Sequence, residues 1–139
     1  KRRTYMEDSW ELVPTKNINQ MLRLRTDINE DNLDEKFKNL LVVKHKYHVA
    51  DDIMFPDPSC LAFFTAFEQN HLVNFEQNGE LKLLGVDIFE GTMKFFIYCD
   101  DAQKTVYDCI SFLKSNPLFK CEFEIILNDN GNSIKKLKA

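Results

Sequence analysis

Residues 81–99 read LKLLGVDIFEGTMKFFIYC, and they lie at the centre of the pattern that decides the fold. Apolar residues alternate on both sides of Glu90-Gly91, which predicts a hairpin of two strands, Leu81 to Phe89 and Met93 to Cys99. A strand and a helix precede this hairpin, and a helix and a strand follow it. From Leu40 to Leu127 the apolar spacing therefore predicts the order strand, helix, strand, strand, helix, strand.

The strand before the hairpin has two different faces. One face is mostly apolar and is expected to meet the helices: Leu41, Val43, His45, Tyr47 and Val49. The other face carries Lys44, Lys46 and His48. The helix that follows begins at an N-cap, Asp57, with Pro58 in its first turn, and it ends at Asn78-Gly79.

The first helix contains a short repeat. Residues 67–70, Phe-Glu-Gln-Asn, recur eight residues later as residues 75–78. Eight residues make a little over two helical turns, so both copies present the same side of the helix. We interpret the repeat as amphipathicity, with phenylalanines toward the core and polar residues near the surface.

A second helix and a last strand complete the pattern. Asp100 is expected to cap this helix, with Gln103 at the reciprocal capping position, and Asn116-Pro117 ends it. Alternation in the last strand predicts a buried face made of Phe119, Cys121, Phe123, Ile125 and Leu127. The opposite face carries Lys120, Glu122 and Glu124.

This order predicts an α+β fold, a ferredoxin-like βαββαβ sandwich whose antiparallel sheet has two helices on one face and an open reverse face. Residues 40–128 form the ferredoxin-like core. Residues 1–39 are expected to form an N-terminal β-hairpin and a charged connector of the same domain. Residues 129–139 form a polar, lysine-rich tail that is expected to fray.

The N-terminal hairpin consists of two short alternating runs, residues 10–13 and 21–26. It is expected to extend or cover one edge of the main sheet. Alternation directs Leu22 and Leu24 inward, with Arg23 and Arg25 outward.

Composition disfavours several classes of protein. The chain has 139 residues, a hydrophobic share of 44% and a formal net charge of -4, which fit one domain and argue against a general nucleic-acid binder. Its apolar runs are too short to cross a bilayer. No membrane association is therefore expected. The four cysteines lack metal-binding spacing and are expected to be buried free thiols, which indicates a cytoplasmic protein.

Few residues have the spacing of a catalytic or metal site, and no cofactor is expected. The four glycines are scattered, which argues against a phosphate-binding loop. His45 and His48 fall on opposite faces of a strand and cannot share a metal ion. Asp51-Asp52 and Asp100-Asp101 precede a helix or turn, where capping explains them better than a cation site. A Cys-His nucleophilic pair stays open, because such partners meet only in space.

The reverse face of the sheet is the candidate functional surface. Alternation places aromatic and charged side chains there, and we assign partner binding to Lys44, Lys46, Phe96 and Tyr98. The alternative is structural: glutamates pair with the lysines across strands, and the N-terminal hairpin or a second subunit covers the aromatics. Single-stranded nucleic acid is disfavoured, because residues 93–98 lack the basic-Gly-aromatic signature of RNA-recognition motifs.

Five short segments resemble a known family: SWEL (9–12), LLVV (40–43), LGV (84–86), FFIY (95–98) and FKCEF (119–123). Together they resemble the domain of unknown function 695. That family is similar in fold to the B-type regulator of ribonuclease E, a ferredoxin-like protein that acts by contacting the nuclease. The resemblance implies binding through protein contacts and supplies no catalytic residue. The chain departs from the family after Asp129, where lysines replace an acidic stretch and a Trp.

The sequence thus predicts a non-enzymatic binding or regulatory module with an unknown protein partner. The alternative is a small hydrolase or ligand-processing enzyme with a cleft between the Asp51-Asp52 loop and the sheet. A deep pocket that holds a histidine beside a thiol or carboxylate would favour the enzyme. A homodimer stays open as well.

Overall fold

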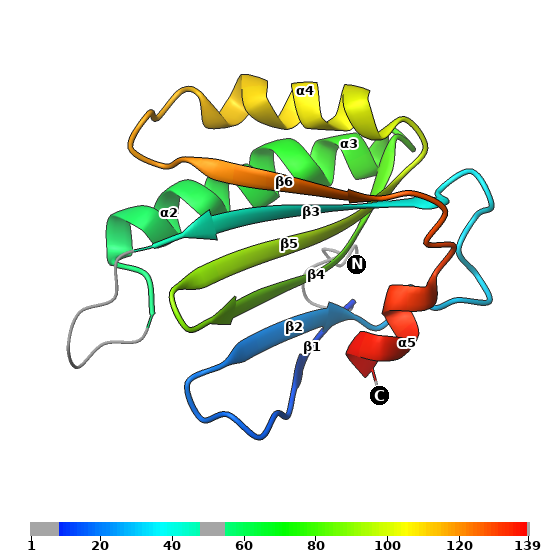
Figure 1. Cartoon of the computed structure of the whole chain (residues 1–139), viewed down its shortest axis with the longest axis horizontal. Coiled ribbons are helices and arrows are strands. Elements are labelled where there is room, and N and C mark those ends of the chain that lie inside the picture. The colour runs from blue at the N-terminus through cyan, green and yellow to red at the C-terminus, as the bar shows by residue number, and fades with distance from the viewer. Residues whose placement is uncertain (1–8, 48–54, 139) are drawn as a thin grey trace, which may run out of the picture.

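The computed structural model describes residues 9–47 and 55–138, which form a mixed α and β fold. One six-stranded sheet forms its centre, with all neighbouring strands antiparallel and in the order β1-β2-β4-β5-β3-β6 (Figure 1). The strands are β1 (Trp10–Val13), β2 (Met21–Arg25), β3 (Asn39–Lys46), β4 (Leu81–Phe89), β5 (Thr92–Cys99) and β6 (Cys121–Ile126). The predicted hairpin is β4 and β5, and its turn residues Glu90 and Gly91 both have positive φ, 49° and 82°.

The helices are α2 (Pro58–Ala66), the π-helical segment η1 (Phe67–Leu72), α3 (Val73–Gln77), α4 (Ala102–Leu113) and α5 (Asn132–Lys138). The first three follow one another without a break. Asp57 caps α2 as predicted, because its carboxylate accepts a hydrogen bond from the Cys60 amide at 2.8 Å. The cap of α4 is Asp101, one residue later than predicted, because its carboxylate accepts from the Lys104 amide.

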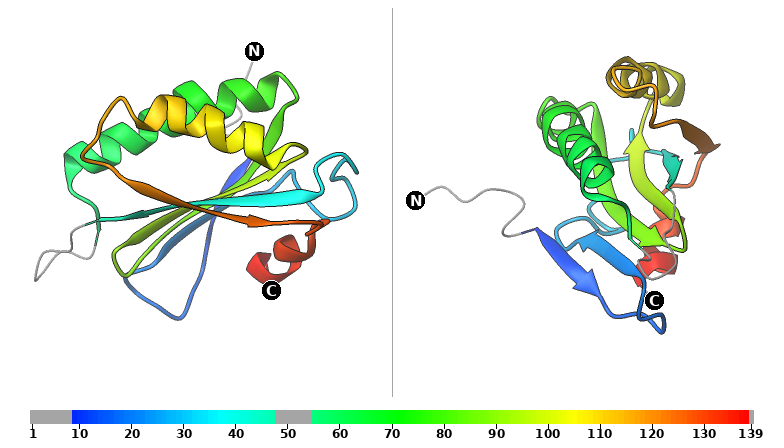
Figure 2. Two further views of the ribbon diagram at one scale, coloured as in Figure 1. Left: turned by 45° about the horizontal axis from the view of Figure 1, so that its top comes forward. Right: turned by 90° about the vertical axis from the view of Figure 1, so that its left-hand side faces the viewer.

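The helices lie on both faces of the sheet. The stretch from α2 to α3 and the helix α4 cover one face, and α5 lies on the other (Figure 2). The main core lies under the first group and includes Phe64, Phe67, Leu83, Phe95 and Ile97. A second apolar cluster lies on the reverse face and includes Leu24, Leu40, Leu84, Tyr98 and Ile134. The expectation of an open reverse face is therefore wrong where α5 packs against the sheet.

The C-terminal segment forms a helix, in place of the expected frayed tail. Ile134 is 2% exposed and packs into the reverse-face cluster, with Leu137 beside it. Lys138 donates a hydrogen bond to the carbonyl oxygen of Ile28 at 2.7 Å, and Lys135 lies 3.1 Å from Glu30. The two apolar side chains are three residues apart, on one side of the helix, and their burial orders a segment that its lysines suggested was loose.

The N-terminal hairpin extends the sheet. β1 pairs with β2, and β2 pairs with β4. Leu22 and Leu24 are buried as predicted. The pairing brings β2 close to Gly85, where β4 has an irregularity in its register with β5. A Cβ atom at Gly85 would lie 2.5 Å from Leu24 Cδ2 and 2.8 Å from the carbonyl oxygen of Arg23, so glycine permits the close approach.

The last strand, β6, is an edge strand and is less buried than predicted. Cys121 and Phe123 pack against the main core, but Ile125 and Leu127 are 39% and 68% exposed. These two residues line a hollow beside the first turn of α4, so the helix does not cover them. Among the described residues, no helix is long and apolar enough to span a membrane.

Candidate functional site

The four residues assigned to partner binding lie in different surroundings. Tyr98 is fully buried, and its hydroxyl donates a hydrogen bond to the carboxylate of Asp129. Phe96 is half-buried against the reverse-face cluster. The side chains of Lys44 and Lys46 are 30% and 76% exposed. Three of the four side chains are thus at least partly exposed, and Tyr98 is buried.

Charged side chains pair across the part of the reverse face formed by β3 and β6. Lys44 Nζ lies 2.8 Å from Glu124 Oε1, and Lys46 Nζ lies 4.0 Å from Glu122 Oε1. The cross-strand pairing that the structural alternative predicted is therefore confirmed. Exposed pairs of this kind contribute between 0 and about 1 kcal/mol, so they shape the charge of the surface more than its stability.

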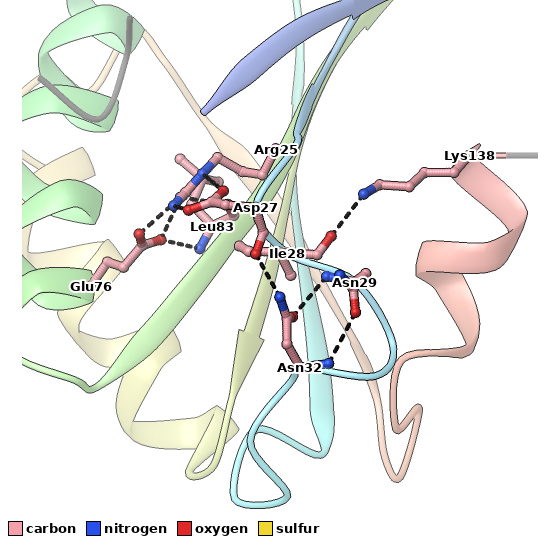
Figure 3. Close-up of polar contacts among 8 residues, drawn as sticks. All are labelled: Arg25, Asp27, Ile28, Asn29, Asn32, Glu76, Leu83 and Lys138. Atoms are coloured by element: carbon pink, nitrogen blue, oxygen red, sulfur yellow. Dashed lines mark hydrogen bonds and ion pairs between the residues drawn. The ribbon is translucent and has the colours of Figure 1, made fainter. Parts of the chain in front are cut away.

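A partly buried ion-pair network, which local alternation did not predict, joins β2 to the helical layer. Arg23 Nη2 lies 2.7 Å from Glu68 Oε1. Arg25 Nη1 donates to both carboxylate oxygens of Glu76, at 2.9 and 2.8 Å, while its Nε and Nη2 donate to Asp27 (Figure 3). The expectation that both arginines point outward is wrong, because β2 lies next to β4 and this face of the strand meets the helices.

Each half of this network repeats along its own element. Glu68 and Glu76 are the glutamates of the eight-residue repeat, on one side of the helical stretch, and Arg23 and Arg25 are two residues apart on one face of a strand. A spacing of eight in a helix and of two in a strand was the signal that could have predicted the pairing. The Trp10 ring lies against both guanidinium groups, 4.7 and 5.7 Å from its centroid. The network fixes the hairpin to the domain.

The outer edge of β6 is a second exposed surface, and it consists of unpaired backbone beside apolar side chains. Among the described residues β6 pairs with β3 alone, so its outer backbone groups have no strand partner. Two hollows lie between β6 and α4. One, of about 420 Å³, is lined by Ile110, Phe119 and Phe123, and the other, of about 630 Å³, includes Ile125 and Leu127.

Exposed apolar side chains concentrate at this edge. Ten large hydrophobic residues of the described chain are exposed, and six of them lie on α4, on β6 or next to β6. These six are Tyr107, Ile110, Leu118, Ile125, Ile126 and Leu127. Exposed apolar groups that gather at one place mark interaction sites more often than scattered ones do.

The family of the chain follows from a comparison with family models. The model of a family of unknown function, DUF695, matches residues 8–133. The chain belongs to this family. The predicted resemblance is thus confirmed, and the match spans every strand of the sheet but ends near the start of α5. Neither the curated proteins nor the solved structures contain a significant match.

In this DUF695 domain, the described cysteines and His45 lie in surroundings that fit a structural role better than a catalytic one. Burial raises the pKa of Cys60 to about 11 and those of Cys109 and Cys121 to about 12, so these thiols stay protonated and are poor nucleophiles near neutral pH. His45 Nδ1 lies 2.9 Å from the carbonyl oxygen of Lys120. His48, Val49 and the Asp51-Asp52 loop lie outside the described residues.

Proposed function

We propose that this DUF695 domain is a non-enzymatic module that binds an extended segment of another protein along the outer edge of β6. The observation that carries the proposal is the coincidence of an unpaired sheet edge with the concentration of exposed apolar residues beside it. An extended segment would add a seventh strand through backbone hydrogen bonds. Its alternate side chains would enter the two hollows between β6 and α4.

The charges on β6 favour another protein over a second copy of the chain. Glu122 and Glu124 lie on the reverse face, with side chains 71% and 50% exposed. If two copies of β6 paired antiparallel over their length, Glu122 would lie opposite Glu124, or Glu124 opposite itself. Like charges directly opposite each other are destabilising. The fitting partner segment therefore alternates apolar residues, toward the hollows, with basic residues, toward the glutamates.

The proposal keeps part of the surface assigned from the sequence. Lys44 and Lys46 lie on β3, next to β6, and their ion pairs with the two glutamates place them beside the proposed edge. The ferredoxin-like arrangement belongs to the proposal too. It is supported by the strand order β4-β5-β3-β6 and by helical connections between β3 and β4 and between β5 and β6. A contact-based role like that of the ribonuclease E regulator would suit such a module.

Selection from a displayed library of random peptides tests the proposal, with the full chain as bait. We expect enriched peptides that alternate apolar and basic residues, and that lose binding to Ile125→Lys. Leu12→Lys, a similar change at an exposed apolar residue of the other edge strand, is the control and should keep full binding. Peptides that bind Ile125→Lys as well as the native chain would contradict the proposal. So would a dimer, seen by light scattering, that Ile125→Lys dissociates.

A further inference from the structure

The hollow of about 420 Å³ between β6 and α4 combines an apolar lining with two lysines. Ile110, Leu113 and Phe123 are among its apolar residues, and its charged residues are Lys114 and Lys120. Both lysines are exposed. Within the part of the chain that the structure describes, neither ammonium group forms an ion pair. The hollow thus offers two unpaired positive charges beside an apolar surface, in a chain whose formal net charge is -4.

The segment that joins α4 to β6 limits the groove at this end. It runs from Lys114 to Lys120, and in Figure 1 it curves from the end of α4 back to the start of β6. Most of its residues line the hollow. An extended chain that ends in the hollow therefore fits without a turn, whereas a chain that continues past it must bend away from the sheet.

The direction of β6 decides which end of an added strand reaches the lysines. All neighbouring strands of the sheet are antiparallel, and an added antiparallel strand would run from the side of Ile126 to the side of Cys121. Its C-terminus would therefore arrive beside Lys114 and Lys120, where its carboxylate is attracted. A parallel strand would bring its N-terminal side there, and an α-ammonium group is repelled by the lysines.

We propose that the β6 edge binds the C-terminal end of its partner protein, with the terminal carboxylate beside Lys114 and Lys120 and the last side chain in the hollow. This inference rests on the proposed function and adds the direction of the bound segment and the end of the chain from which it comes. Capture of a C-terminal carboxylate and addition of a strand to a sheet edge are both recurring modes of peptide recognition.

The same placement predicts the sequence of the partner's C-terminus. If its last residue lies opposite Cys121, its second-last residue lies opposite Glu122 and its fourth-last opposite Glu124. Its last, third-last and fifth-last side chains then lie on the face of Cys121, Phe123 and Ile125, toward the hollows. The expected C-terminus is apolar at these three positions and basic at the second-last and fourth-last positions.

The peptide acetyl-Ile-Lys-Val-Lys-Val-Phe, with a free carboxylate, carries this pattern. Calorimetric titration of the full chain compares it with its C-terminal carboxamide and with a carboxamide extended by Asp-Gly, whose charge lies on a side chain. We expect the free acid to bind about tenfold more tightly than either. Equal binding of the acid and a carboxamide, or no binding of the acid, would overturn the inference. Carboxamide binding that Ile125→Lys abolishes would leave the proposed function intact.

Two lysine variants test the contact with the carboxylate. Lys114→Gln and Lys120→Gln should each weaken binding of the free acid, by up to about fivefold, and leave the affinity for the carboxamide unchanged. Lys16→Gln, the same change at an exposed lysine between β1 and β2, is the control and should affect neither peptide. Equal losses for the acid and the carboxamide, or no loss for the acid, would contradict the contact.

A nitroxide in place of the acetyl group reports the direction of the bound peptide. In an antiparallel complex it lies near the end of β6, so it should broaden the amide signals of Ile126 and Leu127 more than those of Lys120 and Cys121. The opposite pattern would mean a parallel strand and would overturn the inference, even if the peptide binds at the β6 edge.

Discussion

The guanidinium of Arg25 lies 2.8 Å from the carboxylate of Glu76, and the two side chains are only 4% and 11% exposed. Glu76 also accepts a hydrogen bond from the Leu83 amide at 2.8 Å, and Arg25 donates to the Leu83 carbonyl oxygen at 3.2 Å. One pair thus connects the N-terminal hairpin, the helical layer and the centre of the sheet (Figure 3).

Loss of one partner should therefore be costly. We expect Arg25→Met to lower the free energy of unfolding by about 3 kcal/mol, because it leaves the Glu76 carboxylate buried without its counter-ion. Urea denaturation measures this. The control is Lys38→Met, which breaks a pair with Asp100 whose side chains are 45% and 59% exposed, and should cost at most about 1 kcal/mol. Equal losses in the two variants would contradict the structural role of Arg25. The double variant Arg25→Met/Glu76→Met should recover part of the loss.

Tyr98 should hold α5 in place through Asp129. The Asp129 carboxylate accepts hydrogen bonds from the Tyr98 hydroxyl and from the amide and hydroxyl of Ser133, in the first turn of α5. We expect Tyr98→Phe to destabilise the protein by roughly 1–2 kcal/mol and to speed amide hydrogen exchange in residues 132–138. Tyr107→Phe, at a side chain 74% exposed, is the control. Exchange that is unchanged in Tyr98→Phe would show that α5 is held by its apolar contacts alone.

Gly85→Ala should loosen the hairpin. A Cβ atom there would meet the backbone oxygen of Arg23 at 2.8 Å, and backbone cannot move aside as a side chain can. We expect a loss of about 1–3 kcal/mol of unfolding free energy, with faster amide exchange in β1 and β2 than in β3. Uniform exchange across the sheet would contradict a local cause.

Stability should fall as the pH falls from about 7 to about 5, in part because of His71. Burial lowers the pKa of His71 in the folded protein, so the unfolded chain, with a histidine pKa of about 6.5, takes up the proton first. The unfolded state then binds more protons in this range, so the free energy of unfolding decreases as the pH falls. His71→Phe should flatten this dependence. Carboxylates such as Asp27 and Glu124, whose pKa values are lowered by Arg25 and Lys44, act at lower pH and in both proteins alike. Identical pH profiles would contradict this assignment.

Local periodicity was sufficient to predict the strands, but not what covers them, and it wrongly placed Glu68, which is 3% exposed, near the surface. The alternation of 81–99 predicted β4 and β5, and Asp57 marked the start of α2. The burial of Tyr98 depends on α5, a segment over thirty residues later, whose one buried residue, Ile134, is followed by two lysines in the sequence. Likewise, alternation correctly placed Arg25 on the opposite face from Leu24, but the prediction that this face points outward was wrong, because β2 pairs with β4 and the face meets the helices.

The candidate edge shows the same limit. Alternation predicted the apolar residues of β6 correctly as one face, but their exposure depends on where α4 begins. Ile125 and Leu127 lie beside its first turn, across a hollow and not beneath the helix. Whether a helix covers a given residue of an edge strand depends on tertiary packing, and the alternation of the sequence does not report it.

Amide mapping of a bound peptide tests the role of the β6 edge most directly. A peptide from the selection, added to the isotopically labelled full chain, should shift and protect from exchange the amides of Cys121–Ile126, with smaller shifts in α4 and none in β1. Shifts confined to Lys44, Lys46 and Phe96, or to β1, with β6 unaffected, would contradict binding at this edge.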